Sequence, residues 1–164
     1  MFRVRRAVES DLPHVFAIYD DEVLHGTSAF DEVPFTTEQR EAWLAKHRDE
    51  RYPALIAEDA EHVLSWGTLS PWSPEVVFAA SAEAVVHVHK RAGIDGVGRR
   101  MLQELIAHAR AVELSALVAR VCSENQASLT LHSELGFRRI GTLRNVAKKF
   151  GRSLHVELLE LELS

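Results

Sequence analysis

The segment between residues 93 and 98 combines three glycines with the start of a helical pattern. No side chain covers a glycine N–H group, and the first turn of a helix adds unpaired N–H groups and the positive end of its dipole. Such a junction binds anions, and the pyrophosphate of a nucleotide-like cofactor is a suitable one. Four flanking basic residues suit a phosphorylated ligand, or else only solubilise a loop and a helix face: Lys90, Arg91, Arg99 and Arg100.

Histidine and cysteine offer less chemistry. His87 and His89 alternate along an extended segment and therefore share one face, but two ligands do not make a zinc site, so we expect no metal. Cys122 ends an apolar segment, where a buried thiol is expected rather than a nucleophile. It is the only cysteine of the chain, so no intrachain disulfide can form, which suits a reducing compartment.

The overall composition narrows the class of protein. A chain of 164 residues is long enough for one domain with its own core, and we expect a single domain over residues 1–164. A formal net charge of −5 argues against nucleic acid as a partner. No apolar run approaches the roughly 18 residues of a membrane span, and the N-terminus lacks the apolar stretch of a signal peptide. We therefore expect a cytoplasmic protein with no membrane partner.

The elements that must position the glycine junction follow from local periodicity. Apolar residues at helical spacing predict helices over about 11–25, 36–47, 97–109 and 126–135, with Asn125 or Ser128 as the cap of the last one. Alternating or continuous apolar runs predict strands at 2–6, 54–58, 62–69, 116–122, 138–144 and 154–163, and one that ends at His89. The pattern is that of a mixed α/β domain.

The order of these elements and motifs resembles the GNAT superfamily of N-acetyltransferases, and within it the phosphinothricin/methionine sulfoximine acetyltransferase group. The resemblance covers nearly the whole chain. It is carried by the ordered motifs Val4–Ala7, Asp11, Ile18-Tyr19, Thr27–Phe30, Trp43, Arg51–Pro53, Pro71-Trp72, Glu83, Asn125, Ser128, Leu131-His132, Leu135–Phe137 and Gly141–Leu143. It implies a central, twisted, mostly antiparallel sheet with splayed fourth and fifth strands and about four flanking helices.

The resemblance also implies acetyl-CoA as cosubstrate. The family's Q/R-x-x-G-x-G/A signature maps onto Gly93, Ile94, Asp95, Gly96, Val97 and Gly98. Gly93 stands where Gln or Arg is usual, and the Asp95 carboxylate is expected to weaken pyrophosphate binding unless it points to solvent or pairs with Arg91. The resemblance further assigns main-chain contacts with the cofactor to Val86, His87 and Val88, and a hydrogen bond to Asn125, which could also cap a helix.

Two residues are candidates for the proton transfer that an amine acceptor requires. Glu83 occupies the position of the group's proposed catalytic glutamate, near the start of a central strand, although an exposed charge at a strand end is the alternative. His132 matches the histidine of the group's Leu-His pair, although a lone histidine on a helix is more often structural. A backbone N–H near Val88 is the expected donor to the developing oxyanion.

The acceptor site departs most from the group's pattern. Glu75 stands where an arginine that holds the substrate carboxylate is expected, which disfavours an anionic acceptor and favours a cationic or neutral amine. Phe30, Trp72 and Phe78 are further candidates for the acceptor pocket, with core packing as the alternative for the aromatic residues.

The sequence therefore predicts an acetyl-CoA-dependent N-acetyltransferase that acts on the primary amine of a small molecule by direct transfer in a ternary complex. Relatives are commonly homodimers, so a homodimer is expected. Two alternatives remain at this point. The chain could be a peptide or protein N-terminal acetyltransferase on the same fold, or a non-catalytic acyl-CoA-binding sensor, which the unusual Gly93 and Asp95 would suit.

Overall fold

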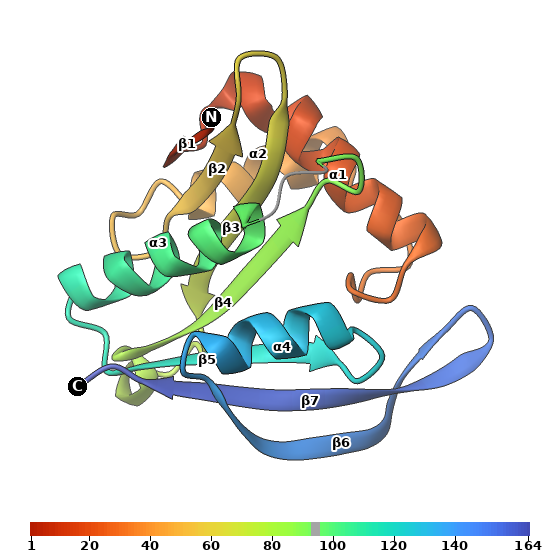
Figure 1. Ribbon diagram of the computed structural model, residues 1–164, viewed down its shortest axis with the longest axis vertical. Coiled ribbons are helices and arrows are strands. Elements are labelled where there is room, and N and C mark those ends of the chain that lie inside the picture. The colour runs from red at the N-terminus through yellow and green to blue at the C-terminus, as the bar shows by residue number, and fades with distance from the viewer. Residues whose placement is uncertain (93–95) are drawn as a thin grey trace.

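Seven strands form one sheet in the order β1-β2-β3-β4-β5-β7-β6 in the computed structural model, which describes residues 1–92 and 96–164 (Figure 1). The strands are β1 (Arg3–Arg6), β2 (Ala54–Glu58), β3 (Val63–Pro71), β4 (Ser81–Val88), β5 (Ala116–Cys122), β6 (Arg138–Lys149) and β7 (Arg152–Glu162). All neighbouring strands are antiparallel except β4 and β5, which are parallel and joined by a helical crossover. The mixed α/β fold expected from the sequence is confirmed.

The described residues form four α-helices: α1 (Leu12–His25), α2 (Thr37–Lys46), α3 (Val97–Ala111) and α4 (Gln126–Glu134). Two short 3-10 turns, Glu9–Asp11 and Val76–Phe78, accompany them. The start of α2 is fixed by a capping box, in which Gln39 N donates to Thr36 Oγ1 at 3.2 Å and Thr36 N donates to Gln39 Oε1 at 2.8 Å. Within the described part of the chain, no helix has both the length and the apolar character needed to cross a bilayer.

The helices cover both faces of the sheet. Leu55 of β2 belongs to a core cluster with the apolar stripe of α3, whereas its neighbour Ile56 packs with Phe16 of α1 and Leu44 of α2. Because successive strand residues point to opposite faces, α3 lies on one face and α1 and α2 lie on the other (Figure 1). The sheet therefore separates two cores, and each face can carry part of a site.

A gap opens between β4 and β5. The two strands pair only from Ser81 to Glu83 on β4 and from Ala116 to Val118 on β5. Beyond these pairs β4 continues to Val88 and β5 to Cys122 with no further pairing between them (Figure 1). The predicted splay of the fourth and fifth strands is thus confirmed, and one edge of β4 is left open.

The last two strands are longer than the sequence pattern indicates. They were expected at 138–144 and 154–163, but β6 runs to Lys149 and β7 starts at Arg152. Irregular pairing between Arg139 and Gly141, and again between Leu143 and Ala147, breaks the alternation of side chains, so the pattern fades before the strand ends. Phe150 (φ 53°) and Gly151 (φ 74°) form the two-residue turn between the strands.

Candidate active site

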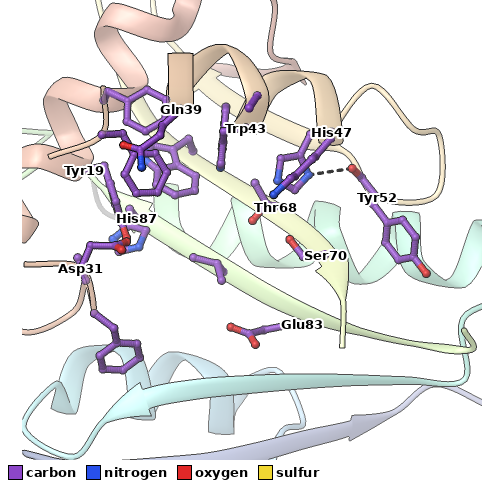
Figure 2. A pocket seen from close by; sticks show the side chains of 18 of the residues that line it. Tyr19, Asp31, Gln39, Trp43, His47, Tyr52, Thr68, Ser70, Glu83 and His87 are labelled. Carbon is purple, nitrogen blue, oxygen red and sulfur yellow. Dashed lines mark hydrogen bonds between the residues drawn. The ribbon is translucent and has the colours of Figure 1, made fainter. Parts of the chain in front are cut away.

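A cavity of about 1060 Å³ lies on the face of the sheet that α1 and α2 cover. Its floor is formed by β3 and β4, and one wall is formed by the loop between α1 and α2 (Figure 2). Aromatic rings line its upper part: Phe16, Tyr19, Phe35, Trp43 and Trp66. Most of these pairs pack edge to face, as Tyr19 and Trp66 do with centroids 5.6 Å apart, whereas Phe16 and Phe35 are tilted. The volume and the apolar lining are those of a small-molecule site.

The Glu83 carboxylate projects from β4 into this cavity (Figure 2). Its neighbour across the gap is Arg120 of β5, whose Nη2 donates to Oε1 at 3.0 Å and whose Nε donates to Oε2 at 3.1 Å. The Glu83 side chain is 16% exposed and that of Arg120 is 47% exposed. Arg120 also lies over the Phe30 ring, 5.8 Å from its centroid. The carboxylate is therefore accessible and held by a cation that solvent can reach.

Two further polar groups enter from α1 and the following loop. The Tyr19 hydroxyl donates a hydrogen bond to Asp31, and both residues line the cavity (Figure 2). Burial and the hydrogen bond to Asp31 both raise the pKa of Tyr19 well above its ordinary value, so the phenol stays protonated at neutral pH. It acts there as a donor to Asp31, not as a base.

His87 lies at the floor of the same cavity. Its ring stacks on Trp66 with centroids 4.8 Å apart and meets Tyr19 edge to face at 5.3 Å. Burial lowers the pKa of His87 to about 4, because the charged imidazolium would lose its hydration, although Glu22 opposes this shift. The imidazole is neutral under ordinary conditions.

The open edge of β4 exposes alternate main-chain groups. His89 N donates to Leu64 O of β3, and hydrogen-bonded pairs alternate along an antiparallel ladder, so His87 also turns its main chain towards β3. Val86 and Val88 consequently turn theirs towards the gap. The bond from Ser115 N to Ala80 O agrees, since it shows an even-numbered residue facing β5. The ladder thus favours the predicted main-chain contacts at Val86 and Val88 and not the one at His87, whose side chain enters the cavity instead.

The first turn of α3 is the next helical turn along the chain after β4, which borders the gap. Gly96 adopts φ +89°, a conformation that residues with a side chain rarely adopt. The first helical bond runs from Arg100 N to Gly96 O, so the N–H groups of Val97 and Gly98 have no partner within the helix. The Val97 side chain is buried in the core, so only its amide can serve a ligand. The predicted cofactor residues Gly93, Ile94 and Asp95 lie outside the described residues.

Gly98, in the first turn of α3, packs closely on its neighbours. A Cβ atom at Gly98 would lie 3.2 Å from Val88 Cγ2 and 3.5 Å from Leu131 Cδ2. Asn125 caps α4, and its Oδ1 accepts a hydrogen bond from Ser128 N at 3.2 Å. The predicted cap is confirmed, and the contact with the cofactor stays a prediction. Amides without a partner in their own helix and an open strand edge together fit a ligand with a diphosphate and an amide-bearing arm.

Three of the four flanking basic residues are already engaged. Lys90 forms an ion pair with Asp21 at 2.9 Å, and Arg100 forms one with Glu104 at 2.6 Å. Arg99 is paired with Glu134. An anion at the start of α3 would therefore depend mainly on main-chain N–H groups, and on arginines that must exchange partners at the surface.

The structure does not bring His132 into the cavity. This residue is 4% exposed, its Nδ1 lies 2.7 Å from Ser128 O, and its ring meets Phe137 edge to face. Burial lowers the pKa of His132, so the ring is neutral. These contacts show that His132 packs α4 against Phe137. Its position does not support the predicted catalytic role.

Three of the four predicted acceptor residues also lie elsewhere. Phe30 lines the cavity, but Trp72, Glu75 and Phe78 belong to the loop between β3 and β4 and are not among the lining residues. Glu75 turns to solvent and accepts a hydrogen bond from the Ser73 hydroxyl. The Glu75 charge therefore does not set which acceptor the cavity prefers, and Glu75 gives no reason to expect a cationic acceptor.

Other residues of the cavity were missed from the sequence. Arg120 is the only charged residue in an otherwise apolar strand, and this signal could have marked it. Asp31 and Lys46 carried no local signal, because only the packing of the loop and of α2 brings them to the cavity. Among the described residues, no group of three or more His, Cys, Asp or Glu side chains is arranged to hold a metal ion.

Comparisons with known proteins agree with this geometry. Residues 2–138 match the model of an acetyltransferase (GNAT) domain. The chain is 37% identical over 161 residues to the L-methionine sulfoximine/L-methionine sulfone acetyltransferase of Pseudomonas aeruginosa, covering 98% of this chain and 94% of the relative. It is 37% identical over 164 residues to the phosphinothricin N-acetyltransferase of Streptomyces coelicolor, covering 98% and 96%.

A solved structure shows the same fold. An acetyltransferase from Salmonella typhimurium, described with its cofactor acetyl-CoA, superimposes with a TM-score of 0.94 at 31% identity, covering 99% of this chain and 94% of that one. These likenesses favour neither the protein N-terminal acetyltransferase nor the non-catalytic sensor.

Proposed function

Because the chain belongs to the GNAT acetyltransferase family, we propose that it transfers the acetyl group of acetyl-CoA to the primary amine of a small amino acid analogue. The transfer is direct, within a ternary complex. One observation carries the proposal: the open edge of β4 borders a cavity that contains an accessible carboxylate, Glu83. The names of the two relatives support the choice of acceptor.

Acetyl-CoA supplies an activated acetyl thioester. The amides of Val97 and Gly98 hold its diphosphate at the start of α3, where the helix dipole favours negative charge. Val86 and Val88 offer main-chain groups to the pantetheine arm along the gap. Asn125 follows the end of β5 as the cap of α4, and its amide group can bond the arm.

Glu83 accepts the proton that the ammonium form of the acceptor must lose before it can attack. Arg120 holds the carboxylate in place until the acceptor arrives. Its exposed guanidinium, which already lies over the Phe30 ring, can then leave the carboxylate and stay on that ring. The substrate ammonium then replaces the Arg120 guanidinium beside the Glu83 carboxylate. Glu83 can receive the proton directly or through a water molecule.

The Val88 N–H group points into the gap, where the thioester carbonyl would lie. A fixed main-chain donor there stabilises the negative charge that develops on the carbonyl oxygen as the amine attacks. The acceptor's own carboxylate can be met by Lys46 or Arg120, the two basic side chains that line the cavity.

We further propose, from the family resemblance, that the enzyme is a cytoplasmic homodimer that binds neither nucleic acid nor membrane. Its net charge of −5 supports the first of these exclusions. Light scattering of the purified protein tests the oligomeric state, and a mass equal to that of one chain would contradict it.

The proposed activity is tested by thiol release from acetyl-CoA with L-methionine sulfone, L-methionine sulfoximine and phosphinothricin as acceptors. We expect turnover with at least one of them. Calorimetry with acetyl-CoA runs in parallel. Binding without turnover across the three amines would favour a sensor, and the absence of both would reject the proposal.

Glu83→Gln tests the base. The variant keeps the shape of the side chain but cannot accept the proton, so kcat should fall by about 100-fold or more while the Kd of acetyl-CoA changes little. Glu104→Gln, on the exposed side of α3, serves as a matched control with unchanged kcat. An unchanged kcat in Glu83→Gln would exclude Glu83 from proton transfer.

A further inference from the structure

Lys149, the last residue of β6, is buried and is not among the residues that line the cavity. It is 4% exposed, although a lysine is rarely buried without a partner of opposite charge. Within the described residues no carboxylate oxygen lies within 4.0 Å of its Nζ. Burial lowers the pKa of Lys149, against the influence of Glu22, Asp31 and Glu32.

Two main-chain carbonyl groups accept hydrogen bonds from this ammonium. Lys149 Nζ donates to Ala29 O at 2.8 Å and to Glu22 O at 3.2 Å. Glu22 lies in the last turn of α1, and Ala29 lies in the loop that follows it. One side chain from the end of the sheet therefore fixes the distance between the helix and its loop.

The loop held in this way is the wall of the acceptor cavity. Ser28, Ala29, Phe30 and Asp31 all line the cavity. Phe30 lies beneath Arg120, and Asp31 accepts the hydrogen bond from Tyr19. A shift at Ala29 would therefore move two residues of the cavity: Phe30, beside Arg120, and Asp31, beside Tyr19.

The strand end that carries Lys149 is itself well fixed. Lys149 pairs with Arg152 across the two-residue turn at Phe150 and Gly151, both with positive φ, as in a type I′ turn. A second, exposed contact joins the same hairpin to the loop: Thr27 Oγ1 donates to Glu124 Oε1 at 3.1 Å, and Arg152 Nη2 donates to it at 2.9 Å. Exposed contacts of this kind contribute little to stability, so the buried Lys149 makes the main contact between the hairpin and the loop.

We infer that Lys149 is a positioning residue for the acceptor, because it holds the Ala29 carbonyl and with it the cavity wall that presents Phe30 and Asp31. The inference rests on the proposed function in so far as the cavity binds the acceptor. It assigns no contact between Lys149 and either substrate.

The kinetic test compares Lys149→Met, Lys149→Arg and the control Lys148→Met, an exposed lysine one residue earlier on the same strand. The acceptor is whichever amine of the three-member panel the wild-type enzyme acetylates fastest. We expect Lys149→Met to raise the acceptor KM about tenfold or more, since small misplacements at a reacting centre are costly, with the acetyl-CoA KM within about twofold of wild type. Lys149→Arg should restore most of the acceptor KM, and Lys148→Met should change neither value.

A purely structural role has a different signature: kcat falls with the fraction of folded protein while both KM values stay unchanged. That result, or an unchanged acceptor KM in folded Lys149→Met, would overturn the inference. Should Lys149→Met not fold, Lys149→Gln takes its place, since its amide keeps a donor but has a shorter reach.

Hydrogen exchange supplies a readout without activity. In the absence of substrates, peptides that cover residues 26–31 should exchange faster in Lys149→Met than in wild type, and should be unchanged in Lys148→Met. Equal exchange in all three proteins would overturn the inference. A wild-type enzyme that acetylates no amine would instead reject the proposed function, and the exchange data would still decide whether Lys149 holds the loop.

Discussion

At the scale of single residues, the cavity sets the chemistry of its side chains by burial. His87 and Glu83 point from the same face of β4, yet His87 lies among aromatic rings and Glu83 lies beside a partly exposed guanidinium. Burial among these rings disfavours the charged imidazolium, so His87 is a neutral ring that shapes the floor. The Glu83 carboxylate is instead held by two hydrogen-bonding nitrogens of Arg120.

The neutral state of His87 makes the stability of the fold depend on pH. The pKa of His87 is about 4 in the folded protein, against about 6.5 for an unperturbed histidine. Between these values the unfolded chain binds a proton that the folded chain does not, so stability is lost as the pH falls below about 6.5. We expect His87 to account for a loss of about 2 kcal/mol between pH 7 and pH 5.

Urea unfolding of wild type and His87→Phe at the two pH values measures this contribution. Phenylalanine keeps a ring on Trp66 but cannot titrate, so the variant should lose less stability between pH 7 and pH 5. The pKa values of His47 and His132 are also lowered by burial, but both residues remain in both proteins and cancel in the comparison. His62→Phe, at an exposed position, is the control. An equal pH dependence in His87→Phe and wild type would refute the assignment.

At the scale of elements, β4 divides its residues between two tasks. Odd-numbered residues bind β3 through their main chain and turn their side chains to the cavity. Even-numbered residues turn their side chains to the α3 core, and beyond Glu83 their main chain faces the gap. One strand thus presents a carboxylate to the cavity and main-chain groups to the gap, because the two sets alternate along a pleated backbone.

This division predicts which amides respond to acetyl-CoA. On binding, the Val86 and Val88 N–H groups should exchange about fivefold more slowly, as expected for a new hydrogen bond worth about 1 kcal/mol. Val85 and His87, already bonded to β3, should change less and serve as internal controls. Amide exchange followed by NMR with and without acetyl-CoA makes the measurement. Equal slowing along the strand would instead indicate a general stabilisation without contact at this edge.

At the scale of the whole molecule, the sheet consists of two halves joined at one end. Strands β1 to β4 and strands β5 to β7 share only the pairs near Ser81 and Ala116 (Figure 1). Further along the gap the halves are connected by side chains, through Arg120 with Glu83 and through Lys149 with Ala29. A ligand that fills the gap would contact both halves and so stabilise the whole fold.

Acetyl-CoA at a hundredfold excess over its Kd should raise the free energy of unfolding by about 2.7 kcal/mol. For a chain of this length that is a rise in Tm of about 5–10 °C. Gly98→Ala should show a smaller rise, because its Cβ would lie 3.2 Å from Val88 Cγ2, at the helix start proposed to bind the diphosphate. Gly141→Ala, with no atom within 4 Å of the added Cβ, is the control. Thermal denaturation measures the shifts, and equal shifts in all three proteins would argue against binding at the start of α3.

The sequence alone determined the elements and their order. The α3 stripe, the capping box at Thr36 and the buried run of β2 are local patterns, because helix and strand periods act over a few residues. The family resemblance added the splayed strands and the place of Glu83 and Phe30 in the site. The long β6–β7 hairpin was underestimated because its irregular pairing interrupts the alternation.

Only the tertiary structure decided which side chains meet. Arg120 reaches Glu83 because β5 is the parallel neighbour of β4, and Lys149 reaches Ala29 across 120 positions of the chain. The structure also leaves Glu75 exposed and outside the cavity lining, and it buries the His132 ring of α4 against Phe137, which is the structural alternative for that histidine. Local periodicity fixes the face on which a residue lies, but the partner on that face depends on how distant elements pack, and no short stretch of sequence contains that information.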